Sequence, residues 1–278
     1  MSFTIGGLLH ALQLKQVGVD RYLAHNVDTG APVVFGGQLL AQSIVAALVG
    51  HEGKTVKTLH SVFARAGSPQ EPLDIDVDPL HRGRAMASST VTFRQGDRRC
   101  ARSMVLLTAD EPDVIRHADR PAAHCRLDEA SGRDPAEAGG WEVRIAAVST
   151  STTLMPSGRP NSTSGPAFPA HPTTNRRARP CWPTPPTASS SAPPCDPIRE
   201  WARPKRTRQS RQGCSATPIT FCEPFSAAEW LLLSHHSPYA GRGRSYGRAD
   251  AFREDGQLVA SFVQDSMIRH LARRSSAL

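Results

Sequence analysis

The feature that most constrains the fold of this chain is a segment of 63 residues, 156–218, with almost no core-forming side chains. It contains no Leu, Val, Met or Tyr and only one Ile and one Phe, yet it holds fourteen of the 23 prolines. It also carries ten Arg or Lys and two acidic residues, an excess equal to the whole net charge of +8. Such a segment cannot bury enough apolar surface to offset the entropy of ordering its backbone. We therefore expect it to be disordered, between two normally patterned parts of the chain.

The uneven charge also limits the partners to be expected. A strongly basic protein is a candidate for nucleic-acid binding, but outside 156–218 the charges sum to zero. No RNA-binding or DNA-binding motif is present, so we expect no specific nucleic acid partner. The non-enzymatic alternative is a salt-sensitive binder of polyanions that uses the basic runs at 176–179 and 205–211.

Membrane, export and disulfide signals are weak in this sequence. No apolar run approaches the roughly 20 residues of a membrane-spanning helix, and residues 1–7 have neither a basic region nor a cleavage site. The six cysteines form no CxxC pair, so we expect free thiols. These observations favour a cytoplasmic protein without a membrane span.

The N-terminal part has the pattern of a helix followed by antiparallel strands. Thr4 can cap a short helix, and an alternating stretch at 14–25 suits a strand. Leu40, Ile44 and Leu48 recur every four residues and predict a buried helix of about fourteen residues. Strand-like runs follow at 56–66, 73–80, 85–93 and 101–108. One helix with an antiparallel meander predicts an α+β unit in which the sheet wraps the helix.

The C-terminal part repeats the second half of this pattern. Runs at 227–234, 247–252 and 258–268 suit strands. The turn at Asp255-Gly256 precedes the last run, as Gln95-Gly96-Asp97 does in the N-terminal part. We interpret this as a weak internal duplication.

Four segments, in order along both parts, resemble the acyl-CoA thioesterase II family. They are FGGQ at 35–38, LHSVFARAG at 59–67, EWLL at 229–232 and GQLVASFVQ at 256–264. The resemblance covers about residues 1–145 and 219–270 and implies a double hotdog fold, two helix-in-sheet units fused side by side. It also implies hydrolysis of fatty acyl-CoA thioesters to a free acid and CoA.

The family's active site, as the resemblance implies, is an Asp, a Ser or Thr, and a Gln that together activate a water. No covalent intermediate, metal or cofactor is expected. Gln264 matches the catalytic Gln, and its amide can both donate and accept a hydrogen bond. The Asp and the Ser or Thr have no counterpart that the sequence identifies.

Four residues are candidates for substrate binding. Gly36, Gly37 and Gln38 open the predicted central helix, where amides can face a carbonyl oxygen or a phosphate. Close packing of the helix against the sheet explains these glycines equally well. His60 lies in a strand-like run and suits a hydrogen-bonded position better than a catalytic base.

The family places the helix of the second unit, with its catalytic Asp, inside the segment that lacks core residues. A shifted reading frame explains this. Because Trp has a single codon, reading one base early turns Cys181-Trp182 into Leu and Trp182-Pro183 into Ala, whatever the other bases are. With the remaining free bases chosen to suit the family, 180–197 becomes an apolar helix that carries an Asp. The alternative is a genuine Pro/Ser/Arg-rich linker.

We therefore expect a double hotdog whose second unit is incomplete. Residues 1–115 form the N-terminal unit, 116–218 a linker and frame-displaced segment, and 219–270 the remaining strands of the second unit. An incomplete unit leaves an unpaired strand edge, so we also expect a homo-oligomer.

Two other motifs could indicate different chemistry. Gly243-Arg-Ser245-Tyr-Gly247 fits the nucleophile elbow of a serine hydrolase, but that elbow needs a strand before it and a helix after it. His235 and His236 are adjacent, so on regular structure they point apart and do not suit one metal site. We expect both histidines in a loop.

Overall fold

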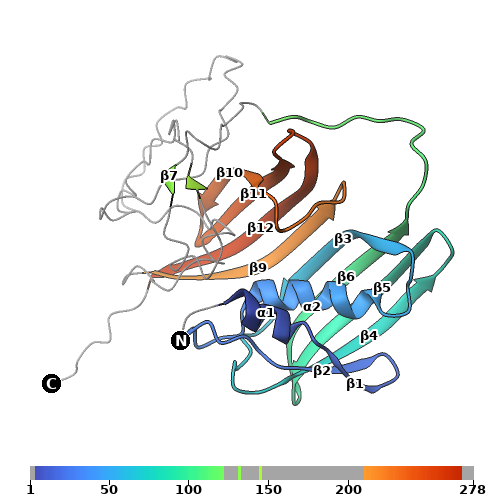
Figure 1. Cartoon of the computed structure of the whole chain (residues 1–278). Helices are drawn as coiled ribbons and strands as arrows, with labels where there is room; N and C mark the ends of the chain where they lie inside the picture. The colour runs from blue at the N-terminus through green and yellow to red at the C-terminus, as the bar shows by residue number, and fades with distance from the viewer. Residues whose placement is uncertain (1–3, 122–130, 133–143, 146–209, 271–278) are drawn as a thin grey trace, which may run out of the picture.

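The computed structural model describes residues 4–121, 131–132, 144–145 and 210–270 (Figure 1). The disorder predicted for 156–218 lies outside these ranges as far as residue 209, but it is wrong for 210–218, which form most of a strand. Within them, no helix is both long enough and apolar enough to span a bilayer.

Two helices belong to the N-terminal half. Helix α1 covers Ile5–Ala11, and the side chain of Thr4 accepts a hydrogen bond from the Gly7 amide at 3.1 Å, as the sequence predicted. Helix α2 covers Gly36–Leu48 and lies across one face of the sheet (Figure 1). We call this the helix-side face and the opposite one the outer face.

Ten strands form a single antiparallel sheet in the order β1-β2-β4-β5-β6-β3-β9-β12-β11-β10. The N-terminal strands are β1 Lys15–Gly18, β2 Arg21–Ala24, β3 Lys54–Phe63, β4 Leu73–Arg82, β5 Met86–Gln95 and β6 Arg98–Ala109. The C-terminal strands are β9 Ser210–Phe221, β10 Leu231–Gly241, β11 Arg244–Arg253 and β12 Leu258–His270. A separate pair, β7 Ser131–Gly132 and β8 Arg144–Ile145, forms a two-stranded sheet. The α+β class and the two-part sheet are those that the sequence predicted.

The main core lies between α2 and the N-terminal strands. Helix α2 contacts β3, β4, β5 and β6, and its apolar residues pack on side chains that alternate along these strands. The largest fully buried ones include Leu59, Leu73, Ile75, Val91 and Phe93. The apolar stripe of α2 and the inward-facing residues of the strands therefore pack into one core, as the helical and strand periods of the sequence predict.

Two hairpin turns occupy corresponding places in the two halves of the sheet. Gly96 joins β5 to β6, and Gly256 precedes β12 after β11. Both have positive φ, 56° and 81°, a conformation that glycine adopts at little cost. Each turn connects the last two strands of its half.

The C-terminal strands start and end differently from the sequence expectation. Strand β9 begins at Ser210, whereas the last strands were expected from 219. Strand β10 covers Leu231–Gly241, so His235 and His236 lie in a strand and not in the expected loop. The two side chains do point apart: His235 stacks edge-on to Phe262 with ring centroids 6.1 Å apart, and His236 is exposed.

Strand β9 joins the two halves of the sheet. It pairs with β3 on one side and β12 on the other. The polar composition of β9 does not predict this pairing. Lys57 reinforces the joint because its Nζ donates to the Phe221 carbonyl at 3.0 Å. Ile219 lies opposite Leu59 and packs against the N-terminal core.

We predict that Leu59→Ala destabilises the N-terminal half strongly. Leu59 is 0% exposed at the joint, and truncation of a buried Leu costs about 2–5 kcal/mol. Leu9→Ala in α1 is the matched control, because Leu9 is 59% exposed and such surface changes stay within about 0.5 kcal/mol. Urea unfolding of both variants measures the difference. Equal losses in the two variants would contradict the packing described above.

Candidate functional site

A row of buried polar side chains crosses the helix-side face where the two halves join. On the N-terminal side, Ser43 Oγ lies 2.8 Å from Ser103 Oγ, which lies 3.0 Å from Ser61 Oγ. Ser61 pairs with Thr217 across the β3–β9 joint, so the row continues into the C-terminal strands. There it consists of Thr217, Gln264, Ser266 and Ser245, which are all buried. We call the whole set the polar row.

Gln264, the predicted catalytic residue, lies in this row on β12. Alternation along β12 puts its side chain on the same face as those of Phe262 and Ser266, and Gln264 is 4% exposed. An amide in such a place can hold a water or a carbonyl oxygen strongly, because the surrounding dielectric is low.

A β-bulge decides which other side chains reach the row. The pairing of β12 with β9 passes from Asp265↔Ala216 to Ser266↔Cys214, so β9 carries one extra residue there. Strict alternation would put Cys214 and Thr217 on opposite faces. With the bulge they share one face, and Cys214 Sγ lies 3.0 Å from Thr217 Oγ1. Neither residue was predicted to belong to a site, because no alternation pattern in the sequence reveals a single bulge.

The glycines that open α2 pack closely on β3. A side chain added at Gly36 would meet the ring of Phe63 at 3.5 Å, and Gly37 is buried. Phe35, the N-cap residue, has no side-chain oxygen to cap the first-turn amides. Contact of these amides with substrate therefore stays a prediction, while the close packing is visible.

Gln38 uses its whole amide inside the protein. Its Oε1 accepts from the Val27 amide at 2.8 Å, and its Nε2 donates to Asn26 Oδ1 at 2.9 Å and to the His25 carbonyl at 3.3 Å. It is 0% exposed. This geometry favours a structural role for Gln38, which fixes the start of α2 against the loop before it.

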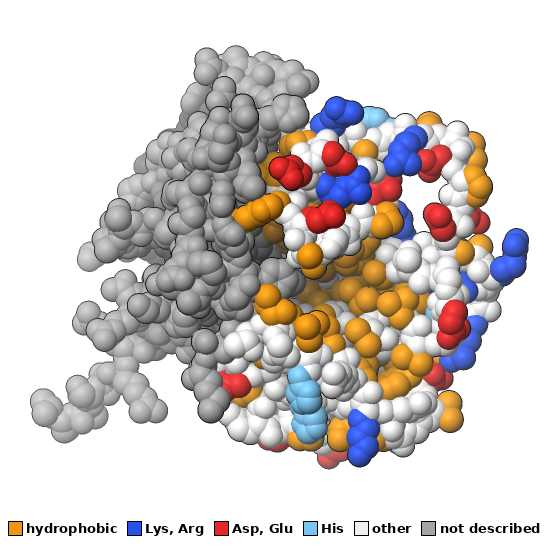
Figure 2. Space-filling view, in the orientation of Figure 1, with side chains coloured by type: hydrophobic (Ala, Val, Ile, Leu, Met, Phe, Trp, Pro, Cys, Tyr) orange, Lys and Arg blue, Asp and Glu red, His pale blue; other side chains and the backbone are white. Residues whose placement is uncertain are grey.

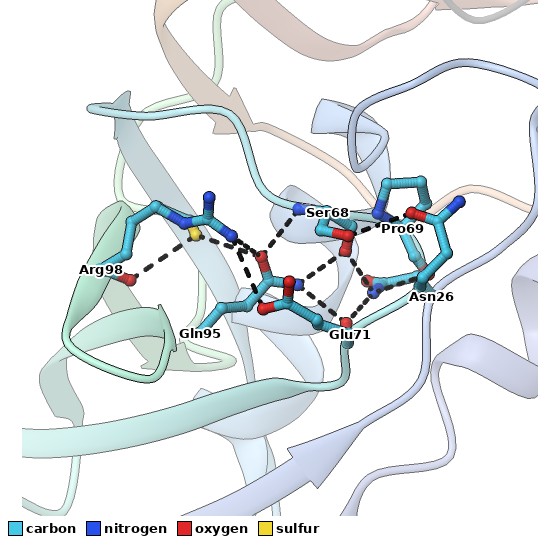
Figure 3. A network of polar contacts seen from close by, with 8 residues as sticks. Asn26, Ser68, Pro69, Glu71, Gln95 and Arg98 are labelled. Carbon is cyan, nitrogen blue, oxygen red and sulfur yellow. Dashed lines mark hydrogen bonds and ion pairs between the residues drawn. The ribbon is translucent and has the colours of Figure 1, made fainter.

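The same bonds continue into a network that holds the loop after β3 (Figure 3). Asn26 Nδ2 donates to the Glu71 carbonyl at 2.6 Å. From β5, Gln95 accepts from the Ser68 amide at 2.7 Å and donates to the Ser68 and Glu71 carbonyls at 2.7 and 2.8 Å. Arg98 donates to Gln95 at 2.9 Å. Gly67 lies in this loop next to Ser68, and a side chain there would lie 2.9 Å from Val34.

His60 lies away from the polar row. It is on β3 between Met104 of β6 and Pro218 of β9, and its side chain is exposed. Its neighbours Leu59 and Ser61 are buried on the helix-side face. The structure therefore separates His60 from Gln264 by the thickness of the sheet.

Ser245 does not lie in a nucleophile elbow. It follows the hairpin turn between β10 and β11 and is itself part of β11, so no helix comes after it. Asp250 and Asp265 leave the opposite face of the sheet, because they alternate with Ser245 and Ser266. The serine-hydrolase alternative lacks both the turn and the acid that it requires.

The helix-side face also carries an apolar surface beside the polar row. Figure 2 shows hydrophobic side chains gathered in a hollow on this side of the molecule. On the C-terminal strands the apolar side chains of this face are half-buried: Ile219, Phe221, Leu231, Leu233 and Phe262. None of residues 210–270 forms a helix. An acyl chain has the chemistry to lie on such a surface.

A second hollow, of about 560 Å³, is polar and lies elsewhere. Glu229, Arg253, Glu254 and Asp255 line it. The hydrogen bond from Arg253, at 2.7 Å, lowers the pKa of Asp255. Three carboxylates with one guanidinium repel phosphate groups, so this hollow does not suit CoA. Across the described ranges, no three His, Cys, Asp or Glu side chains are grouped as metal ligands.

The bonding of Gln38 generates a prediction. Gln38→Leu keeps most of the volume but leaves the Val27 amide and Asn26 Oδ1 without their partner, and each such buried group costs about 1–3 kcal/mol. Gln16→Leu is the matched control, because Gln16 is exposed. Thermal unfolding should show a clear loss for Gln38→Leu alone. If Gln38→Leu instead kept full stability and only weakened substrate binding, the structural role would be wrong.

Comparisons with known proteins agree with this architecture. Residues 23–108 match the model of the acyl-CoA thioesterase N-terminal domain, and residues 214–268 match that of the C-terminal domain. Acyl-CoA thioesterase 2 of Haemophilus influenzae is 33% identical over 97% of this chain and 99% of its own length. Acyl-coenzyme A thioesterase 8 of Mus musculus is 24% identical over 85% of this chain and 80% of its own length.

Solved structures show the same fold. The acyl-CoA thioesterase II TesB2 of Mycobacterium marinum superposes with a TM-score of 0.67 at 22% identity, over 95% of this chain and 99% of that one. The tesB protein of Mycobacterium avium subs paratuberculosis gives 0.65 at 17% identity, over 96% and 99%. With both domain models matched on the two halves of one sheet, and a relative aligned along almost the whole length, the chain belongs to the acyl-CoA thioesterase family.

Proposed function

We propose that this chain hydrolyses acyl-CoA thioesters to a free acid and CoA. The observation that carries the proposal is that both halves of the sheet match acyl-CoA thioesterase domains, joined through the β3–β9 pairing. The helix-side face offers what such a substrate needs, an apolar surface beside buried polar groups. A cytoplasmic location is part of the proposal and is tested by imaging the tagged chain in its host.

Gln264 is the residue that we place at the reacting thioester. It lies in the polar row, next along β12 to the half-buried Phe262 on the same face. An acyl chain on the apolar surface would bring its carbonyl towards this row. The Gln264 amide N–H then donates to the carbonyl oxygen, or its Oε1 orients the attacking water, and either bond is strengthened by burial.

No general base is identified among the described residues of this chain. The family resemblance implies an Asp on the second helix and a Ser or Thr, and the predicted frame shift between about codons 148 and 218 would remove both. General acid–base help contributes about 10²–10⁴-fold, and misplacement of reacting groups by about 1 Å adds a further loss of about 10². We therefore infer that hydrolysis by this chain is slow.

Restoring the frame tests this inference. The nucleotide sequence across codons 140–220 should show one base lost near codon 148 and one gained near codon 218. A chain made from the corrected gene should release CoA from acyl-CoA at least about 10²-fold faster than the present chain. Equal rates would mean that the chemistry lies in residues common to both.

Gln264→Ala tests the role of the amide. In the frame-restored chain it should lower kcat by about 10²–10³, the cost of losing one donor to a developing oxyanion, with KM little changed. Gln70→Ala serves as the control, because Gln70 is exposed in the loop after β3. An unchanged kcat in Gln264→Ala would exclude this role.

We also propose that the chain forms a homo-oligomer. Strands β1 and β10 end the ten-stranded sheet, and the outer face exposes Val62 of β3 and Met104 of β6 at diagonal positions. Unpaired strand edges and exposed apolar side chains both favour association. Light scattering after size-exclusion chromatography gives the mass, and a monodisperse monomer would contradict the proposal.

A further inference from the structure

The β9 bulge puts a thiol into the polar row. Cys214 is half-buried, its Sγ lies 3.0 Å from Thr217 Oγ1, and it pairs across the strands with Ser266. Side chains that are directly opposite on antiparallel strands have Cβ atoms about 4.5–5.5 Å apart. Cys214, Thr217 and Ser266 therefore face the same small region, on the same side of the sheet as Gln264.

Ser266 supplies a second observation at this place. It is 0% exposed, and its Oγ has no hydrogen-bond partner among the residues that the structure describes. A buried hydroxyl without a partner costs free energy, so it needs an explanation other than packing. A ligand oxygen beside Cys214 would give it an acceptor.

The other two described cysteines differ from Cys214. Cys100 is buried in the N-terminal core, and burial raises the pKa of its thiol. Cys222 is exposed just after the end of β9. Of the three, Cys214 alone combines partial access with buried polar neighbours that can bind a carbonyl oxygen.

We propose that Cys214 is an acylation site, at which the thiol takes the acyl group from a bound acyl-CoA. The Cys214 sulfur forms a bond to the thioester carbonyl carbon, the bond from that carbon to the CoA sulfur breaks, and the thiol proton ends on the released CoA. One thioester is exchanged for another, so the step needs no metal, oxidant or energy source. The inference rests on the proposed function only in that the chain binds acyl-CoA.

Ser266 favours this acyl transfer by donating a hydrogen bond to the thioester carbonyl oxygen. While the new bond forms, negative charge develops on the carbonyl oxygen, and a preorganised donor stabilises it. The Ser266 hydroxyl can donate here, because no group in the described part of the chain accepts from it. In the absence of an efficient general base for hydrolysis, the acyl group should remain on the protein long enough to be detected.

The test uses the full chain and decanoyl-CoA as the probe. After a short incubation and an acid quench, intact-protein mass spectrometry should show one added acyl group, and peptide mapping should place it on Cys214. Hydroxylamine, which cleaves thioesters, should remove it. Cys214→Ser should lack this adduct, while the control Cys222→Ser should form it at the wild-type rate.

Ser266→Ala separates a chemical role from a structural one. Removing an unsatisfied buried hydroxyl should leave the unfolding temperature unchanged or higher, while acylation of Cys214 should slow by about 10². A variant that is less stable and acylates at the normal rate would overturn the role given to Ser266.

Binding measurements distinguish failure of this inference from failure of the proposed function. A decanoyl-CoA thioether, which cannot react, is titrated by calorimetry and should protect Cys214, but not Cys222, from iodoacetamide. Thioether binding with no adduct on Cys214, or an adduct that forms equally on Cys222, overturns the acylation site alone. Absence of both thioether binding and CoA release overturns the proposed function and this inference together. An adduct on Cys214 without turnover supports the inference and counts against hydrolysis by this chain.

Discussion

The pairing of β3 with β9 is the contact on which the rest of the structure depends. Through it a second set of strands, 210–270, extends the sheet that wraps α2. Without this ladder β9 would have one strand partner, and its sequence is too polar to bury a face by itself. The ladder hydrogen bonds, the Lys57 contact with the Phe221 carbonyl and the packing of Ile219 near Leu59 hold it in register.

Register across the joint then decides where polar groups collect. Because Ser61 faces Thr217 and Ser266 faces both Cys214 and Ser245, small polar side chains from six elements line up on one face. A one-residue slip would send them to the outer face. The bulge in β9 shifts the register locally by one residue. This shift places the Cys214 thiol among these hydroxyls.

The buried glutamines show how differently one side chain can be used. The side-chain amides of Gln38 and Gln95 form hydrogen bonds mainly with backbone groups of two loops, and so they fix the conformation of these loops. Gln42 donates to the Ala11 carbonyl, while its Oε1 has no partner. Gln264 instead belongs to the polar row at the joint, where we propose that the thioester carbonyl lies. Burial alone does not separate these roles; the surrounding partners do.

Local sequence determined most of the individual elements. The four-residue stripe of α2, the alternation of β3 to β6, the Thr4 cap and the turns at Gly96 and Gly256 all follow from short-range preferences that each segment carries in its own residues. The position of Gln264 on a strand was visible in the same way. The family resemblance, carried by four short segments, added the two-part sheet.

Tertiary structure decided the rest, because it depends on pairings between residues far apart in the chain. Ser210–Phe221 forms a strand because β3 and β12 lie on either side of it, although residues 210–218 belong to the segment that the sequence predicts to be disordered. His60 and Gln264 both lie on strands, and only the register shows that they leave opposite faces of the sheet. Cys214 reaches the polar row through a bulge that is fixed by its cross-strand partner. The sequence by itself thus determined most of the elements, and only long-range hydrogen bonding decided that β9 forms and which side chains meet.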